Sequence, residues 1–588
     1  MQPIRNETSA SLKRLATLMA VVGATAAGLA ACGGGGDSSP TPPPPSVTPP
    51  SPPPPPPPAA PGTVLSGKLY GPTGAQVTLQ NNGGDDLVAS VLASAGGPYP
   101  YDATAFAFTA KLLDGVAYAA TLKTVPAGLA CSVYFGGAGT MPVAAGALRV
   151  GCEYQFDHVN RSADDSVVGT YYDTYQYSMG GSDEPIGTTT QATGEGRFVA
   201  FTSSATVPGA SNGYRQVFWR DRYDGTTYMV SAVDGAVGGA PGNDNSYAPA
   251  ISADGLTVVF ESSASNLVAN DTNAVSDIFV WSRLDPGKLT RVSVGAGDVQ
   301  ANGASSEPTV SGDGKVVAFS SGASNLTGGV SGNSTINVIR RDLASGTNTL
   351  VTSDYTNGSG VGGARPHLSE DGTRLAFYSY SSKIVPGDVN ALWDVFVYDS
   401  STGAKSRVSL SSTGGERNQG NESISRVVAP VISGNGRYVA YATTSTNVVP
   451  NDTNDKQDVF VVDTQTGSVV RASVGNGGTQ GNADSPIGQG ERLAISYDGA
   501  WVAFSTYANN LGAGAGGSGI GNVVMRNWVT GETKAVTDKT TGSVSTASMS
   551  RKAGYVLFGS SNALDARFTA SGLFAAFTGL QPSFAWEQ

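Results

Sequence analysis

Charged residues and histidines are scarce in this chain. Only 14% of its 588 residues are Asp, Glu, Lys or Arg, and it contains two histidines and three cysteines. Few charges disfavour helices that rely on a charged outer face, and so few histidines and cysteines make a four-ligand zinc site improbable. By contrast, 78 glycines, with frequent serine, threonine, asparagine and valine, are typical of turn-rich β structure. The composition therefore predicts an all-β fold.

Acidic residues outnumber basic ones, and the net charge is −11. Residues 1–31 hold three basic side chains and one acidic side chain, so their removal would leave −13. A body of this charge repels the phosphates of nucleic acids and of anionic lipids. The sequence thus argues against nucleic acid as a partner.

The N-terminus has the features of an export signal. Basic residues precede an apolar run over residues 15–31, which is rich in alanine and glycine and shorter than the roughly 20 residues of a membrane-spanning helix. The run ends in Leu29-Ala30-Ala31-Cys32-Gly33, which resembles the lipobox of bacterial lipoproteins. That resemblance implies a signal peptide over 1–31, a lipid on Cys32 and anchoring in the cell envelope, at the outer membrane of a Gram-negative host. A plain signal peptide and a membrane-spanning helix are the alternatives.

Residues 32–62 are dominated by glycine and proline. Proline fixes φ and removes the amide donor, so this segment predicts polyproline II at about 3.1 Å per residue, on the order of 60 Å in all. We interpret it as a tether that holds the folded part away from the membrane. A docking motif for a proline-binding domain is the alternative.

Residues 63–154 predict a small β-sandwich. Short strands are expected at 77–80, 105–108 and 118–122, with turn-forming residues between them. This segment resembles short immunoglobulin-like modules of bacterial surface proteins, which implies a spacer or adhesive role.

Cys131 and Cys152 both lie in this β-rich segment. An exported protein folds in an oxidising compartment, and pairing these two leaves no free thiol once Cys32 is lipidated. We therefore expect a disulfide that closes a loop of roughly 20 residues and stabilises the fold by about 3 kcal/mol.

A unit of about sixty residues repeats between residues 160 and 588. The clear copies hold Ser-x-Asp-Gly or a close variant and then an apolar strand, as in Ser252-Ala253-Asp254-Gly255 before Val258–Phe260. Third and fourth strands follow, such as Asp277–Val280 and Thr290–Val294. The repeated glycines lie 55 to 64 residues apart, at Gly196, Gly255, Gly314, Gly372, Gly436, Gly499 and Gly554.

Four antiparallel strands per repeat predict a propeller blade, which we label a to d from the axis outwards. A single blade leaves both faces uncovered, so the copies must stack in a ring. We predict a seven-bladed β-propeller, with six blades as the alternative. The last copy needs a fourth strand, for which Ser583–Trp586 and Tyr172–Met179 are candidates. We favour Tyr172–Met179, because pairing both chain ends in one blade locks the ring.

The pattern Ser-x-Asp-Gly-x-x-Val-Ala-Phe, followed by Asp-Val-Phe-Val, resembles the repeats of TolB-like (WD40-like, PD40) propellers. This resemblance implies contacts with envelope proteins. The chain departs from TolB in carrying the predicted sandwich where TolB has an α/β domain, which puts a role in the TolB system in doubt.

The two ends of the predicted ring differ. Because strand direction alternates, the a–b and c–d turns lie on one face and the b–c and d–a loops on the other. The a–b turns are short, whereas the opposite face collects long polar loops. Loops longer than a turn requires are common sites of function, so we predict that the loop side binds the ligand.

Three b–c loops on that side carry Asp-x-Asn-x-x-x-Asp. Oxygen ligands at alternate positions suit Ca²⁺, which takes six to eight oxygens at about 2.3–2.6 Å. The alternative is that these side chains satisfy turn amides. The three sets are Asp271, Asn273 and Asp277; Asp388, Asn390 and Asp394; and Asp452, Asn454 and Asp458.

We find no conventional catalytic motif in the sequence and predict no cofactor besides this calcium. His367 begins an innermost strand, where it could act as a general base in the channel or serve as a hydrogen-bonded structural residue. The pattern favours a non-catalytic propeller that binds a protein, a glycan or cell-wall material. The rival is a hydrolase or lyase that uses carboxylates near the axis.

Overall fold

The computed structural model describes residues 62–92, 102–159, 177–180, 196–204, 213–222, 225–285, 288–328, 335–418, 428–486, 492–512, 521–537, 544–564 and 572–578. The predicted signal peptide, Cys32 and nearly all of the predicted tether lie outside these residues. Within them, no helix has the length and apolar character needed to cross a membrane. The helical turns are two 3-10 turns, η1 (Val233–Gly235) and η2 (Ala296–Asp298).

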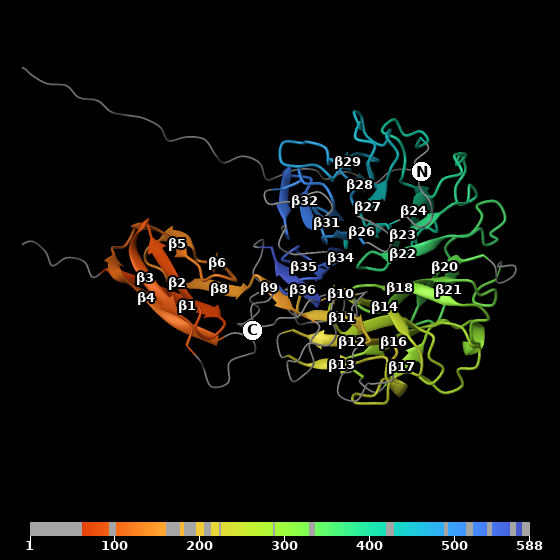
Figure 1. The fold of residues 1–588 in the computed structure, drawn as a ribbon, viewed down its shortest axis with the longest axis horizontal. Helices are drawn as coiled ribbons and strands as arrows, with labels where there is room; N and C mark the ends of the chain where they lie inside the picture. The colour runs from red at the N-terminus through yellow and green to blue at the C-terminus, as the bar shows by residue number, and fades with distance from the viewer. Residues whose placement is uncertain are drawn as a thin grey trace, which may run out of the picture. The chain divides into compact units, whose positions relative to one another are not determined.

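Two four-stranded sheets with a shared core form the N-terminal part, drawn in red and orange in Figure 1. The first has the order β4 (Asp102–Leu112), β1 (Thr63–Gly71), β8 (Leu148–Tyr154), β6 (Leu129–Phe135). The second has the order β3 (Gly84–Ser90), β2 (Gln76–Asn81), β5 (Ala117–Thr124), β7 (Ala138–Thr140). The strands β1 and β8 run parallel. Leu69, Val77 and Val150 meet in the core because apolar side chains alternate along these strands.

The predicted pairing of Cys131 and Cys152 is present. The two residues are directly opposed on the antiparallel strands β6 and β8, with Cα atoms 4.1 Å apart. Cys152 is fully buried, and Cys131 packs against the same core. The disulfide therefore joins neighbouring strands of one sheet.

The remaining described strands form seven four-stranded antiparallel sheets, as the repeats predict. Blades 1 to 3 are β10 (Tyr177–Gly180), β11 (Phe198–Ser203), β12 (Gln216–Asp221), β13 (Thr227–Met229); β14 (Ser246–Ile251), β15 (Thr257–Ser262), β16 (Asp277–Ser282), β17 (Leu289–Arg291); and β18 (Ser305–Val310), β19 (Val316–Ser321), β20 (Asn337–Asp342), β21 (Asn348–Leu350).

Blades 4 to 7 continue in the same order from strand a to strand d. They are β22 (Ala364–Leu368), β23 (Arg374–Ser379), β24 (Asp394–Asp399), β25 (Lys405–Arg407); β26 (Val431–Ile432), β27 (Tyr438–Thr443), β28 (Asp458–Asp463), β29 (Val469–Arg471); β30 (Ala494–Ile495), β31 (Trp501–Thr506), β32 (Asn522–Asn527), β33 (Glu532–Ala535); and β34 (Val544–Met549), β35 (Tyr555–Ser560), β36 (Gly572–Phe577), β9 (Phe156–His158).

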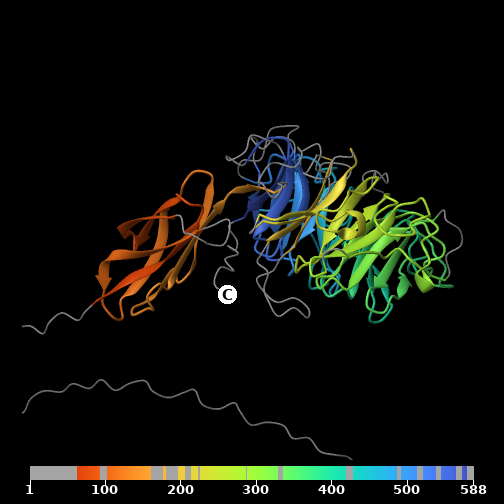
Figure 2. The same ribbon diagram turned by 90° about the horizontal axis from the view of Figure 1, so that it is seen from below.

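The blades stand in a closed ring. The inner strand of each blade contacts that of the next, and β34 of blade 7 contacts β10 of blade 1. Figure 1 shows this ring face on and Figure 2 shows it from the side. Strands b and c of several blades, such as β11, β12 and β31, are buried at every position because neighbouring blades cover both faces.

The aromatic residue of the Val-Ala-Phe segment recurs because it packs against an aromatic residue on the neighbouring strand of the same blade. In blade 2, Phe260 of β15 is directly opposite Phe279 of β16, and the ring centroids are 5.8 Å apart. The same cross-strand pair occurs in blade 4, where Phe377 and Phe396 lie 5.6 Å apart. Such pairs add about 0.5–1.5 kcal/mol beyond the burial of their area.

The Ser-x-Asp-Gly motif builds the a–b turn. In blade 3, the Oγ of Ser311 donates to Asp313 at 2.9 Å and accepts from the amide of Val316, while Asp313 accepts from the amide of Lys315. Gly314 has a φ of +71°, which glycine adopts at little cost. The motif is therefore structural.

The last blade is closed by a strand that we did not predict. Its fourth strand is β9, three residues long, antiparallel to β36 and drawn in orange beside it in Figure 1. The prediction that Tyr172–Met179 closes this blade is wrong, because Tyr177–Gly180 is instead the inner strand β10 of blade 1. A strand of three residues is too short to show a detectable alternation of apolar and polar residues. Because β9 belongs to blade 7, the propeller begins before its predicted start at residue 160.

Candidate functional site

The turn face carries the a–b and c–d turns, and three side chains of its a–b turns meet at the axis. Nε of Arg551 lies 3.1 and 3.2 Å from the two carboxylate oxygens of Glu370, and its guanidinium carbon lies 3.8 Å from the centroid of the Tyr497 ring. These residues belong to the a–b turns of blades 7, 4 and 6. Blades 4 and 7 are not neighbours in the ring, so their ion pair must cross the axis.

Glycines in the intervening turns make room for this clasp of Glu370, Tyr497 and Arg551. A Cβ on Gly312 would lie 2.1 Å from Cγ of Glu370, and one on Gly434 would lie 2.3 Å from Cδ2 of Tyr497. Backbone bonds also join the turns, with the amide of Glu370 donating to the Gly434 carbonyl at 2.9 Å. The a–b turns of successive blades therefore pack against one another around the axis on the turn face. The opposite side of the propeller, which carries the b–c and d–a loops, is the loop face.

The inner strands of blades 2 to 4 contain bulges next to proline. Ala248, Glu307 and Arg365 precede the prolines and have positive φ values of 47°, 54° and 59°. Non-glycine residues in this region cost of order 1–3 kcal/mol and cluster at functional sites. Nε of Arg365 lies 3.5 Å from Glu307, and the two side chains are 28% and 39% exposed. The inner strands of blades 3 and 4 thus present an ion pair that solvent can reach.

Glu261 lies beside this ion pair, between blades 2 and 3. Its carboxylate accepts from the amide of Glu307 at 3.4 Å. Burial raises the pKa of Glu261 to about 7, and the charge of the Glu307 carboxylate also raises it. The Glu261 carboxyl group therefore gains and loses its proton near neutral pH, a property that general acid catalysis can use.

His367 forms a hydrogen bond to the neighbouring blade. Its Nδ1 accepts from the amide of Ile432 in the next blade at 3.2 Å. Burial lowers the pKa of His367 to about 4, and the positive charge of Arg492 lowers it further. A neutral imidazole with this acceptor occupied favours the structural role over that of a general base.

The three Asp-x-Asn loops each surround an arginine of strand d. Arg471 Nη1 lies 2.9 Å from Asp452 and 3.1 Å from Asp458. Arg291 contacts Asp271 at 3.0 Å and Asp277 at 3.5 Å. Arg407 contacts Asp388 at 2.8 Å and Asp394 at 3.4 Å. In each blade, the guanidinium lies where the calcium prediction requires the cation.

Two of the three asparagines direct their amide nitrogen, not their oxygen, towards the carboxylates that would bind the cation. Nδ2 of Asn273 donates to Asp277 at 2.8 Å, and Nδ2 of Asn454 donates to Asp458 at 2.9 Å. Asn390 instead uses its Oδ1 to accept from the amide of Leu392 at 3.0 Å. Burial raises the pKa of Asp452. Amide donors and a guanidinium do not fit a calcium ion, so calcium would require these side chains to rearrange.

Blade 4 has the most acidic version of this cluster. Glu416 stands where the other two blades have glutamine, and its carboxylate lies 2.7 Å from Nη2 of Arg407. Oxygens of Asp388, Asp394 and Glu416 lie within 4.8 Å of one another. Arg407 bonds all three, and Arg417 adds a second guanidinium 3.2 Å from Asp394. Calcium binding here stays a prediction.

The asparagines of the long d–a loops also have structural partners. Asn302 donates through Nδ2 to Ser324 at 2.9 Å, and its amide donates to Asn325 at 3.0 Å. The same arrangement recurs at Asn243, Asn418 and Asn482. These amides hold each d–a loop against the following b–c loop, so the polar composition of the loops is mainly structural.

Exposed apolar side chains are concentrated on the loop face. Among the described propeller residues, ten large apolar side chains are exposed, and eight of these follow strand b or strand d. Leu284 and Val529 are the two in c–d turns. The eight on the loop face are Tyr214, Val237, Val299, Ile336, Tyr355, Tyr380, Val389 and Tyr507. Tyr380 also contacts Trp393, with ring centroids 5.7 Å apart.

No protein-family model and no curated protein matches the chain. Similar solved structures include the β-propeller domain of the Trilobed protease from Pyrococcus furiosus, 12% identical over 71% of this chain and 99% of that one, with a TM-score of 0.40. Oligogalacturonate lyase from Vibrio parahaemolyticus is 10% identical over 72% and 96%, with a TM-score of 0.40. TolB from Acinetobacter baumannii is 17% identical over 54% and 58%, with a TM-score of 0.31.

These similarities concern the fold alone. The seven sheets themselves define the class, which is an all-β protein with a seven-bladed β-propeller. A propeller fold by itself does not define a function, because one fold can support both binding and catalysis.

Proposed function

We propose that this chain is an envelope-anchored lipoprotein whose propeller binds a protein, a glycan or cell-wall material on its loop face and catalyses no reaction. The supporting observation is the unequal distribution of exposed apolar side chains, eight of ten on the loop face. Exposed tyrosines and aliphatic residues on one face are typical of an interaction surface.

Paired variants test the loop face. Tyr380→Ala and Tyr355→Ala remove exposed rings on the loop face, and Leu284→Ala removes an even more exposed apolar side chain on the turn face. Envelope fractions and cell-wall glycans would be presented to the immobilised chain. We expect retention to fall at least fivefold in the tyrosine variants and to stay unchanged in Leu284→Ala. Equal retention by all three variants would contradict the proposal.

The location is tested separately. The lipobox residues support lipid attachment at Cys32, so labelled palmitate should be incorporated by the parent chain and not by Cys32→Ser. We expect the parent in the outer-membrane fraction and the variant in the soluble periplasm. Equal labelling of both chains would refute lipidation at this cysteine.

A hydrolase or lyase is the second candidate, supported by the carboxyl pair of Glu261 and Glu307. The raised pKa of Glu261 would let it donate a proton near neutral pH, with the Glu307 carboxyl group beside it. Such an enzyme would cleave one of a panel of peptides and polysaccharides, and Glu261→Gln would abolish cleavage. Binding without turnover by the parent chain would favour the first proposal.

A further inference from the structure

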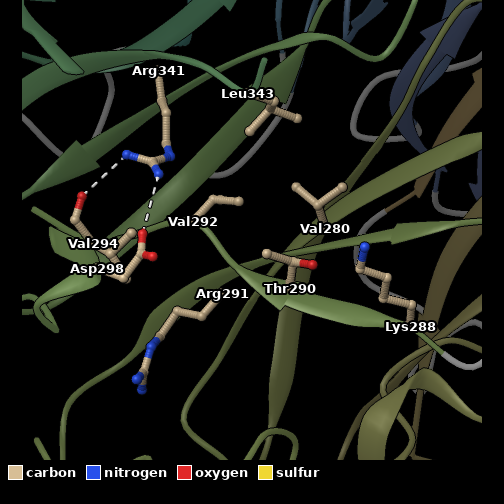
Figure 3. Close-up of a pocket in the computed structure, with 9 residues that line it drawn as sticks. All are labelled: Val280, Lys288, Thr290, Arg291, Val292, Val294, Asp298, Arg341 and Leu343. Atoms are coloured by element: carbon tan, nitrogen blue, oxygen red, sulfur yellow. Dashed lines mark hydrogen bonds and ion pairs between the residues drawn. The ribbon is translucent and has the colours of Figure 1, made fainter. Parts of the chain in front are cut away.

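A cavity of about 460 Å³ lies between the outer strands of blades 2 and 3. Its walls come from strands c and d of blade 2 and from the third strand of blade 3, and Figure 3 shows Leu343 and Arg341 across from Val280, Thr290 and Val292. This volume is in the range of small-molecule sites, about 300–1,000 Å³. None of the residues that line the cavity belongs to the inner strands or to the clasp.

The cavity combines apolar walls with positive charge. Val280, Val292 and Leu343 line it, together with Lys288 and Arg341. Arg291 also borders it, but its guanidinium points away from the other lining residues in Figure 3 and pairs with Asp271 and Asp277. A ligand with an apolar body and one anionic group would match this lining.

Arg341 is a buried cation without a close anion. Its residue is 8% exposed, and its Nη1 donates to neutral oxygens of Val294, Gly346 and Asn348 at 3.3, 2.9 and 2.9 Å. Within the described part of the chain, its Nε has no partner. Its Nη2 approaches only Asp298, at 4.0 Å, and that carboxylate is 90% exposed. A buried charge paired this weakly is costly. Arg526 of blade 6 is equally buried and its Nε also lacks a partner among the described residues, so it is the adjoining cavity that distinguishes Arg341 and gives an anion access to it.

Asp298 stands at the position that a ligand anion would take. It belongs to η2, and its φ of +58° is one that few residues other than glycine adopt. Its exposed side chain can turn into solvent, because no closer bond holds it to Arg341. Arginine binds carboxylate and phosphate oxygens through paired N–H groups, so the guanidinium is suited to either anion.

We propose that this cavity binds an amphipathic organic anion, whose carboxylate or phosphate group pairs with Arg341 in place of Asp298 and whose apolar chain lies against Val280, Val292 and Leu343. The site uses Asp298 of one d–a loop but none of the eight exposed apolar side chains of the loop face, so its failure would leave the proposed function untouched. The binding step is an exchange of one anionic partner for another and involves no covalent change.

Calorimetric titration of the full chain tests the site. Octanoate and octyl phosphate are the anionic probes, octanol lacks the charge, and acetate lacks the apolar chain. We expect saturable binding of one or both octyl anions, and at least tenfold weaker binding of octanol and acetate. A stronger response to octyl phosphate than to octanoate would identify phosphate as the preferred group. No saturable binding of either octyl anion would overturn the proposal.

Three variants locate the binding. Arg341→Gln should weaken the octyl anion at least tenfold. Arg526→Gln is the matched control, because Arg526 is equally buried and caps the c–d turn of blade 6 through Gly531 and Thr533; it should bind within twofold of the parent. Asp298→Asn removes the competing carboxylate from an exposed position and should tighten binding two- to fivefold. Unchanged affinity in Asp298→Asn, or equal losses in both arginine variants, would overturn the assignment.

Discussion

The ion pair across the propeller axis should make a measurable contribution to stability, which Glu370→Gln tests. The substitution keeps the size of the side chain and removes the charge opposite Arg551. The paired side chains are only 13% and 12% exposed, so Arg551 would remain buried without its anion. Breaking a fully buried pair costs about 3–5 kcal/mol, and the partial exposure and the retained stacking on Tyr497 reduce this to about 2–3 kcal/mol.

Urea unfolding followed by tryptophan fluorescence measures this loss. With Arg551→Gln and the double variant, the experiment becomes a cycle whose coupling energy we expect to be about 1–2 kcal/mol. The control is Lys123→Gln, which breaks an exposed pair with Asp86 and should cost less than about 1 kcal/mol. A Glu370→Gln variant as stable as the parent, or a cycle with no coupling, would refute the view that this ion pair stabilises the propeller.

Further predictions concern pH and charge. Glu261 has a raised pKa, so the stability that it contributes is complete below about pH 4.5 and is lost as pH rises through about 7. The free energy of unfolding of Glu261→Gln should therefore rise by up to about 3 kcal/mol relative to that of the parent between pH 5 and 8. Parallel pH profiles of the two proteins would contradict this. His367 has a lowered pKa, so its contribution to stability is complete above about pH 6.5 and is lost as pH falls through about 4. In His367→Gln, the urea concentration at the unfolding midpoint should depend less on pH over that window. The same pH dependence as in the parent would count against this prediction. Arg471→Gln leaves Asp452 and Asp458 without their cation, so we expect the free energy of unfolding to fall by about 3 kcal/mol and Ca²⁺ to restore part of this loss. If Ca²⁺ raised the melting temperature of the parent by the same amount, the arginine would not occupy the position of the cation.

The repeats allowed most of the propeller to be predicted. Blade number, strand order and the Asp-Gly turns follow from short-range patterns, because each repeat encodes the same four strands and its own turn bonds. The closing strand was missed for the opposite reason. β9 is three residues long, and only its antiparallel pairing with β36 identifies it as part of blade 7.

The candidate site divides in the same way. The sequence located the Asp-x-Asn loops, yet it did not show that Arg291, Arg407 and Arg471 occupy them. A signal was available, because arginine ends strand d in the same three repeats that carry the aspartates. Comparing the repeats with one another would have favoured an ion pair over calcium.

By itself, the sequence determined the all-β fold, the repeat that favours seven blades and the two kinds of face, because strand alternation, turn residues and repeat length are local properties. The pairing of the cysteines followed from their number and the expected oxidising compartment. Only the tertiary structure decided which side chains meet across the axis and between blades. Glu370 and Arg551 are 181 residues apart and come together because the ring closes. The cavity beside Arg341 likewise depends on how two blades pack, which no single repeat specifies.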